Sequence, residues 1–167
     1  RLAGRIGTAA VIVLMITGCV MPPPSAQAQS GSGDTIRHMA EQEEKHLRTF
    51  DDLLNERRVR PTLLSPLWHV AGFALGAGTA LMGEKAAHAC TEAVETVIED
   101  HYYDQVDELE TAGDSELAGT FAKFRDEEAE HRELAEAEGA REAVGYPLLS
   151  AAIQAGCRLA IKVSEKV

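Results

Sequence analysis

The chain has few cysteines, few aromatic residues and little basic charge. Its three cysteines, Cys19, Cys90 and Cys157, show no paired spacing and form no Cys-x-x-Cys, which argues against a disulfide framework, a zinc ribbon and a rubredoxin site. Lysine and arginine total 16 against 27 acidic residues, so the formal net charge is −11. Because such a chain repels phosphate, we expect no nucleic acid among its partners.

Strand signals are also scarce, and helix-forming residues take their place. Only 5% of the residues are aromatic, and the chain is rich in Ala, Leu and Glu, which favours helices over sheet. Its 167 residues suffice for one domain with a substantial core. Proline and glycine between the periodic segments place helices at about residues 35–58, 84–111, 116–138 and from 147 onward. We therefore predict an all-α fold.

Two Glu-x-x-His pairs, Glu43/His46 and Glu128/His131, lie within apolar helical patterns. Residues three apart share one face of a helix, and an uncompensated carboxylate buried on that face would be costly. A third inward-facing carboxylate, Glu95, occurs on a separate helical segment. Ferritin-like proteins hold two metal ions with such side chains. We predict a metal site here; the alternative is solvated Glu and His on helix surfaces, because Glu-x-x-His alone is weakly specific.

An apolar segment without Asp, Glu, Lys or Arg spans residues 67–82, between Pro66 and Gly83. It is shorter than the roughly 20 residues that cross a bilayer. Trp68 and His69 at one end suit a helix that lies in the membrane interface. Gly72 and Gly76 form a G-x-x-x-G pattern, which allows close helix contact. Membrane contact and a buried core helix are both open from the residues alone.

Several longer motifs resemble the demethoxyubiquinone hydroxylases. They are Arg57-Arg58-Val59-Arg60-Pro61-Thr62, Pro66-Leu67-Trp68, Gly72-Phe73-Ala74-Leu75-Gly76-Ala77-Gly78-Thr79-Ala80-Leu81, Ala89-Cys90-Thr91, Phe124-Arg125-Asp126-Glu127-Glu128 with Glu130-His131, and Ile153-Gln154-Ala155-Gly156-Cys157-Arg158. The resemblance covers residues 34–167. It implies a ferritin-like four-helix bundle with an additional apolar membrane-interface helix. It also implies a di-iron monooxygenase of ubiquinone biosynthesis that hydroxylates a demethoxyubiquinol ring.

The resemblance assigns roles to particular residues. The two Fe ions would be bound by Glu43, His46, Glu95, Glu128 and His131. A His-Tyr pair near the iron and quinone site matches His101 and Tyr102, and the latter lies two helical turns beyond Glu95. An amphipathic-helix Tyr is also commonly a core residue. Because the polyprenyl substrate stays in the bilayer, candidate substrate or membrane contacts are Trp68, Phe73, Leu75 and Leu81.

The same resemblance implies co-substrates, partners and a location. O2 would be the co-substrate and NADH the reductant. The partners would be a polyprenyl demethoxyquinol, a membrane surface and a quinone-delivering lipid-binding protein, while a homo-oligomer stays open. The protein would be peripheral on the cytoplasmic face of the bacterial inner membrane, or on the matrix face of the mitochondrial inner membrane.

Residues 1–33 depart from the family pattern. Members carry an additional helix with an Asp-His-Ala-Gly-Glu-Tyr-Gly motif whose Glu is a sixth ligand. This chain has only a partly similar Ala-Gly-x-x-Gly segment at its start, with Arg5 at the position of that Glu. Residues 16–19 and 26–28 are similar to lipoprotein and signal-peptidase cleavage boxes. We interpret residues 1–33 as an export signal, a displaced first helix or a disordered leader, followed by a di-iron hydroxylase domain at 34–167. Without a sixth ligand, one iron should bind more weakly.

Two functions of different classes therefore remain. The first is the quinol-hydroxylating enzyme. The alternative is a metal-binding or quinone-binding helical-bundle protein whose oxygenase activity is impaired by loss of the first ligand Glu. A rubrerythrin-like peroxidase or iron store would share the ligands, but it does not explain the apolar segment at residues 67–82.

Overall fold

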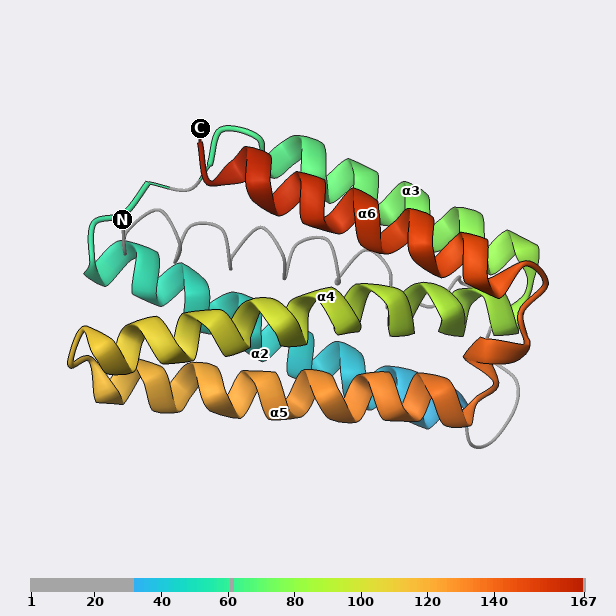
Figure 1. Cartoon of the computed structure of the whole chain (residues 1–167), viewed down its shortest axis with the longest axis horizontal. Helices are drawn as coiled ribbons and strands as arrows, with labels where there is room; N and C mark the ends of the chain where they lie inside the picture. The colour runs from blue at the N-terminus through green and yellow to red at the C-terminus, as the bar shows by residue number, and fades with distance from the viewer. Residues whose placement is uncertain (1–31, 61, 167) are drawn as a thin grey trace.

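The computed structural model describes residues 32–60 and 62–166, and this part of the chain is entirely helical (Figure 1). Its elements are α2 (Ser32–Glu56), α3 (Ser65–Met82), α4 (Glu84–Thr111), α5 (Ser115–Ala137), the short 3-10 helix η1 (Ala140–Glu142) and α6 (Tyr146–Ser164). The all-α prediction is confirmed, and the arrangement is consistent with a ferritin-like helical bundle. Our interpretations of residues 1–33 concern a segment that, up to residue 31, lies outside the described residues.

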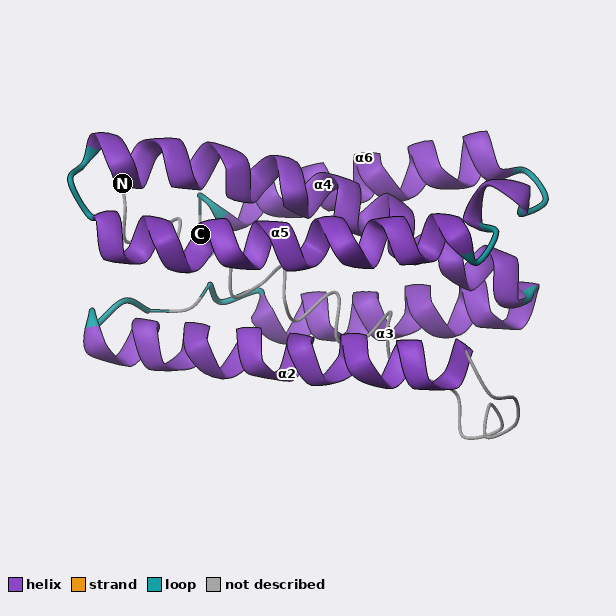
Figure 2. Ribbon diagram, turned by 90° about the horizontal axis from the view of Figure 1, so that it is seen from below, coloured by secondary structure: helices purple, strands orange, loops and turns teal. Residues whose placement is uncertain are grey.

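The long helices run lengthwise along the molecule, with α4 in contact with most of the others. It packs against α5, α6, α3 and η1, while α2 packs against α5 (Figures 1 and 2). Figure 1 shows that α4 and α5 run in opposite directions, and that α2 runs opposite to α5. This places the two Glu-x-x-His pairs, on α2 and α5, on antiparallel neighbours.

Short local signals set the helix boundaries. Gly83 separates α3 from α4 with φ of 117° and ψ of 166°, a conformation that a residue with a Cβ rarely adopts. Asp114 caps the start of α5, where its carboxylate accepts a hydrogen bond from the Leu117 amide at 3.4 Å, and it pairs at 2.7 Å with Arg57, the residue that follows α2. Pro147 lies in the first turn of α6, where its missing amide is not needed.

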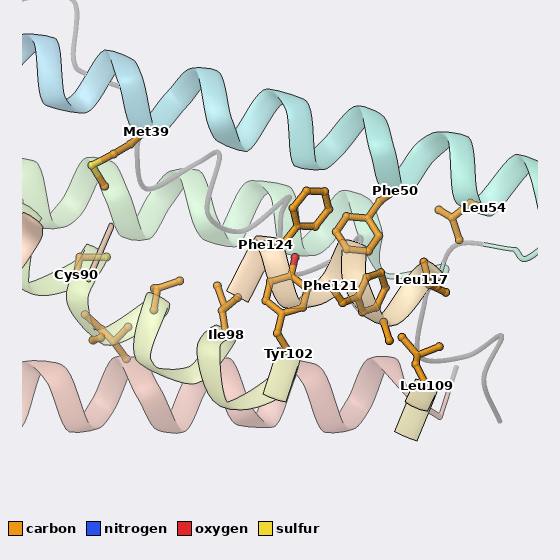
Figure 3. Close-up of a cluster of buried hydrophobic side chains, with 14 residues drawn as sticks. Met39, Phe50, Leu54, Cys90, Ile98, Tyr102, Leu109, Leu117, Phe121 and Phe124 are labelled. Carbon is orange, nitrogen blue, oxygen red and sulfur yellow. The ribbon is translucent and has the colours of Figure 1, made fainter. Parts of the chain in front are cut away.

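The main core is an aromatic and aliphatic cluster between α2, α4 and α5 (Figure 3). Phe50 packs edge-on against Phe121 with ring centroids 5.4 Å apart, and Tyr102 packs edge-on against Phe121 at 5.7 Å. Phe124 continues the cluster toward His46, with 4.1 Å between their ring centroids. This core therefore lies directly beside one of the predicted metal ligands and leaves little room for its ring to move.

Helix α3 presents two different faces. Gly72, Gly76 and Thr79 are buried, as the G-x-x-x-G pattern predicts for a close helix contact. The outward face carries large apolar side chains, of which Phe73 is 57% and Leu81 is 91% exposed. Within the described part of the chain, no helix combines the length and apolarity needed to cross a membrane.

Candidate metal centre

Five predicted ligands from three helices meet in the interior of the bundle. Helix α2 supplies Glu43 and His46, α4 supplies Glu95, and α5 supplies Glu128 and His131. None of the five side chains is exposed at all. The convergence follows from the sequence pattern, because the 3.6-residue period puts each pair on the same face as the apolar residues around it. The alternative of solvated surface residues is therefore wrong for these five positions.

The two histidines face a shared group of carboxylates. Nδ1 of His46 lies 3.1 Å from Oε1 of Glu128, whose Oε2 lies 3.2 Å from Nδ1 of His131. Glu43 spans the same pair of rings, with Oε1 3.3 Å from Nδ1 of His131 and Oε2 3.9 Å from Nδ1 of His46. Glu95 lies on the His131 side, with Oε1 4.0 Å from that Nδ1. Two carboxylates thus lie between the histidines, and the third lies beside one of them.

The polar atoms at the centre of this group lack ordinary hydrogen bonds. Among the described residues, no hydrogen bond reaches either carboxylate oxygen of Glu43, Glu95 or Glu128, or Nδ1 of His46 or His131. Ligand atoms of Glu43, Glu95, Glu128 and His131 all lie within 4.8 Å of one another. Buried polar groups are nearly always satisfied, so this arrangement fits a bound cation. Carboxylate oxygen with imidazole nitrogen suits a divalent transition metal.

The pKa shifts of the three carboxyl groups also indicate that this site requires positive charge. Burial, and then the charge of Glu128, raises the pKa of Glu43 to about 7. Burial followed by the charges of Glu128 and Glu43 raises the pKa of Glu95 well above its ordinary value. Burial also opposes ionisation of Glu128, but the close contacts with the His131 and His46 rings, at 3.2 and 3.1 Å, and their positive charge outweigh burial and lower the pKa of Glu128 to about 2. Three carboxylates here cannot all be ionised without a compensating positive charge.

The other ring nitrogen of each histidine, Nε2, contacts a residue of the opposite helix. Nε2 of His46 lies 2.6 Å from Oε2 of Glu127, and Nε2 of His131 lies 2.9 Å from Oε1 of Gln42. A carboxylate and an amide oxygen only accept, so Nε2 of each ring is the nitrogen that donates. In the neutral form of each ring, Nδ1 is then the nitrogen that carries the lone pair, and it faces the carboxylates, as a metal ligand requires.

Tyr102 lies in the aromatic core, and Figure 3 shows its hydroxyl directed toward Phe124. The side chain is only 1% exposed, and within the described part of the chain its hydroxyl has no hydrogen-bond partner. Burial, and then the charges of Glu128 and Glu43, raises the pKa of Tyr102 well above its ordinary value. An ordinary core tyrosine satisfies its hydroxyl, so this one is distinguished by its need for a partner. The neighbouring His101 is half-buried.

The predicted substrate and membrane contacts lie on α3, a helix that carries none of the five ligands. Phe73 and Leu81 point outward, whereas Leu75 packs against the main core. Trp68 packs against Ala160, and its Nε1 donates to the Ser164 hydroxyl at 2.8 Å. The structure therefore divides this group into two exposed residues and two that contact the rest of the bundle.

Sequence reasoning missed Gln42 and Glu127 as partners of the histidines. A signal for them exists, because each precedes a ligand Glu and so extends both motifs to a five-residue pattern, Gln42-Glu43-x-x-His46 and Glu127-Glu128-x-x-His131. The contact between the helices could not be inferred from either motif alone. It depends on the antiparallel alignment of α2 and α5, which brings the first residue of each motif to the histidine of the other.

Comparison with known proteins agrees with these motifs. Residues 10–164 match the family model described as ubiquinone biosynthesis protein COQ7. A Rhodospirillum rubrum protein named 3-demethoxyubiquinol 3-hydroxylase is 60% identical over 141 residues, which are 83% of this chain and 65% of that protein.

Eukaryotic relatives share the same region. The human protein named mitochondrial NADPH-dependent 3-demethoxyubiquinone 3-hydroxylase is 48% identical over 138 residues, covering 81% of this chain and 64% of its own length. A Saccharomyces cerevisiae protein named mitochondrial 5-demethoxyubiquinone hydroxylase is 43% identical over 146 residues, covering 79% and 63%. The chain thus spans somewhat less than two thirds of the length of these relatives. The match to the family model extends over most of the chain, which therefore belongs to the COQ7 family of ubiquinone biosynthesis proteins.

Proposed function

We propose that this protein is a di-iron monooxygenase that hydroxylates the ring of a demethoxyubiquinol in ubiquinone biosynthesis. The observation that carries the proposal is the buried group of three carboxylates and two imidazoles whose inward atoms lack hydrogen bonds within the described residues. The names of the relatives add support, since they describe hydroxylases of demethoxyubiquinone or demethoxyubiquinol. Residues 34–167 would form the hydroxylase domain.

The residues of the centre would act by holding two metal ions close together. Bound iron would supply the reduction and activation of O2. Glu43 and Glu128 each lie between the two histidines, so they are suited to contact both ions, while Glu95 would serve the ion beside His131. The histidine rings are held at Nε2, which keeps Nδ1 directed at the metal. We infer that the chain contributes a preorganised and water-poor ligand set.

Tyr102 and His101 would orient the substrate. The Tyr102 hydroxyl is buried without a partner in the described part of the chain and experiences the charges of Glu128, Glu43 and Glu95. Its raised pKa keeps it protonated, so it can donate a hydrogen bond to an oxygen of the quinol ring. His101, on the same turn of α4, would help to position that ring.

A substrate with a polyprenyl tail requires a protein surface that reaches the bilayer. We propose that the outward face of α3, with Phe73 and Leu81, lies in the membrane interface. Helix α3 packs against α4, the helix that carries Glu95 and Tyr102, so a membrane contact on α3 would lie one helix away from the centre. The protein would then be peripheral on the side of the membrane that supplies reduced nicotinamide. A quinone-delivering partner or a second copy could bind the same face.

The alternative is a metal-binding or quinone-binding bundle whose oxygenase activity is impaired. One observation supports it: on the His46 side the described residues offer only that ring with Glu43 and Glu128, whereas the His131 side also has Glu95. The iron on the His131 side would then bind well, and the iron on the His46 side would bind poorly. Both functions require the same buried centre, so metal content alone does not separate them.

A turnover assay separates the two functions. The protein would be reconstituted anaerobically with ferrous iron, desalted, and mixed with a short-chain demethoxyquinol, O2 and either NADH or NADPH. The monooxygenase predicts about two irons per chain and a hydroxylated product, with iron and product both lost in Glu128→Ala. We expect NADH to support turnover, while the name of the human relative makes NADPH the necessary comparison. Tight iron binding without product would favour the alternative.

A further inference from the structure

Glu127 and Gln42 occupy equivalent positions, each at Nε2 of a histidine whose Nδ1 faces the carboxylates, but they differ in charge. Each is the residue before a ligand Glu, each comes from the helix opposite the histidine it contacts, and each accepts from Nε2 of that ring. The contact to Glu127 is the shorter, at 2.6 Å against 2.9 Å. A carboxylate accepts a charge-assisted hydrogen bond, which is shorter and stronger than the neutral bond to an amide oxygen. The two halves of the centre are therefore alike in geometry and unlike in charge.

The charge balance of the centre gives this difference a consequence. Two divalent ions carry four positive charges, whereas the buried carboxylates Glu43, Glu95 and Glu128 supply three negative charges. Glu127 is the next carboxylate, in direct contact with His46. A carboxylate behind a ligand imidazole makes the ring a stronger donor to the metal. The side that lacks Glu95 is thus the side that has Glu127 behind its histidine.

We propose that Glu127 is a positioning residue that supplies, through His46, the fourth negative charge of the di-metal centre, and that Gln42 leaves the His131 position without such a charge. The inference rests on the proposed metal-binding function. Glu95 and Glu127 then divide the remaining charge between the two positions, one as a direct neighbour of His131 and one through the ring of His46.

The surroundings of Glu127 suit this role. Its side chain is 15% exposed and its other oxygen, Oε1, lies 4.0 Å from Nζ of Lys45 and 3.7 Å from Nζ of Lys123. Both lysines are more than half exposed, so water screens these contacts and they contribute little. The lysines therefore leave most of the charge of the Glu127 carboxylate in place. Its orientation is set by Oε2, which accepts from Nε2 of the buried His46 at 2.6 Å.

The test measures metal binding rather than turnover, with Co2+ as a redox-stable probe of the centre. Glu127→Gln keeps the acceptor and the size of the side chain and removes its charge. Gln42→Glu adds a charge behind the other histidine. Glu130→Gln is the matched control, because it makes the same change in net charge at an exposed position of α5. Calorimetric titration gives the two binding steps, and thermal melting of the metal-free variants checks that each is folded.

We expect Glu127→Gln to weaken one Co2+ step by about 10- to 100-fold and to leave the other within about twofold of the control. Gln42→Glu should tighten the other step. A second measurement follows the ring protons directly: in the Co2+ protein, the Nε2 proton of each ligand histidine should give a shifted, exchangeable NMR resonance. Glu127→Gln should move one of the two resonances, and Glu127→Ala should broaden it through exchange with water.

The outcomes separate this inference from the function on which it rests. If the unaltered protein binds Co2+ and Glu127→Gln matches Glu130→Gln in both steps and both resonances, then Glu127 has no role at the centre and the inference is wrong. If the unaltered protein does not bind Co2+, or if Glu128→Ala binds Co2+ equally well, the proposed metal centre itself is wrong. A loss confined to one step in Glu127→Gln supports both.

Discussion

Replacing Glu95 by Leu should make the metal-free protein more stable and the metal-loaded protein less stable. Glu95 is fully buried, and within the described residues neither of its carboxylate oxygens has a hydrogen-bond partner. Leaving such a group buried costs about 1–3 kcal/mol, which a leucine of similar size would remove. The substitution leaves no charge unpaired, because His131 keeps Glu128 at 3.2 Å and Glu43 at 3.3 Å.

The expected shifts follow from the size of the chain. For a domain of this length, about 1–3 kcal/mol corresponds to a rise in Tm of about 2–12 °C in the presence of a chelator. A divalent metal at about 1,000 times its Kd stabilises a protein that binds it by about 4.1 kcal/mol per site, which exceeds the gain of about 1–3 kcal/mol from removing the buried carboxylate. Glu95→Leu should lose most of that gain at the His131 position. The order of the two melting temperatures should therefore reverse when metal is added.

The assay is thermal unfolding followed by circular dichroism, in EDTA and in excess Co2+. Glu99→Leu, one turn further along α4, is the control: it removes a partly exposed pair with Arg132 at 2.9 Å and should leave the metal-dependent shift intact. Two results would refute the reasoning. One is a Glu95→Leu protein that melts below the unaltered protein in EDTA. The other is a variant that gains as much from Co2+ as the unaltered protein does.

Three further predictions address pH, packing and membrane contact. In EDTA, the free energy of unfolding should fall from pH 6 to pH 9. Burial raises the pKa of the Glu43 carboxyl to about 7. Burial lowers the pKa of His131, but the neighbouring Glu128 and Glu43 outweigh it and raise that pKa to about 9. The folded state then holds protons that the unfolded state releases, and denaturant titrations showing a rise over this range would contradict this. Phe121→Ala should cost about 3–5 kcal/mol by opening a cavity in the aromatic core, measured by the same titrations; a cost under about 1 kcal/mol would be typical of a surface site. Phe73→Glu should reduce flotation with zwitterionic phosphatidylcholine vesicles, whereas Tyr103→Glu, at a similarly exposed position on α4, should not; equal loss in both would argue against α3 as the membrane contact.

Helix boundaries were predictable wherever the chain carries strong local signals. The predicted helix at residues 84–111 coincides with α4, because glycines flank it on both sides. Predicted helices beginning at residues 116 and 147 differ from α5 and α6 by one residue, since Asp114 and Pro147 mark these starts. The predicted start at residue 35 lies three residues after Ser32, the first residue of α2, because helix ends are the least certain part of a prediction from sequence.

The burial of the five ligands was also predictable, and for a physical reason. An apolar face at the helical period must turn inward, so a Glu or His at the same period is carried into the core with it. The apolar pattern through this pair on α5 is indeed buried at all six of its positions, Leu117, Phe121, Phe124, Glu128, His131 and Ala135. The outward face of α3 was less certain, because an apolar segment of that length fits a core helix as well as an interface helix.

The sequence by itself determined the helices, the inward faces of α2, α4 and α5, and the chemical types of the ligands, because these depend on residues close together along the chain. Only the tertiary structure decided that Glu43 and Glu128 lie between the two histidines and that Tyr102 is buried without a hydroxyl partner in the described part of the chain. It also decided that Gln42 and Glu127 each contact the histidine of the opposite helix. These features depend on the alignment of α2 against α5, separated by some 80 residues in the chain. Packing of whole helix faces sets that alignment, and no local motif encodes it.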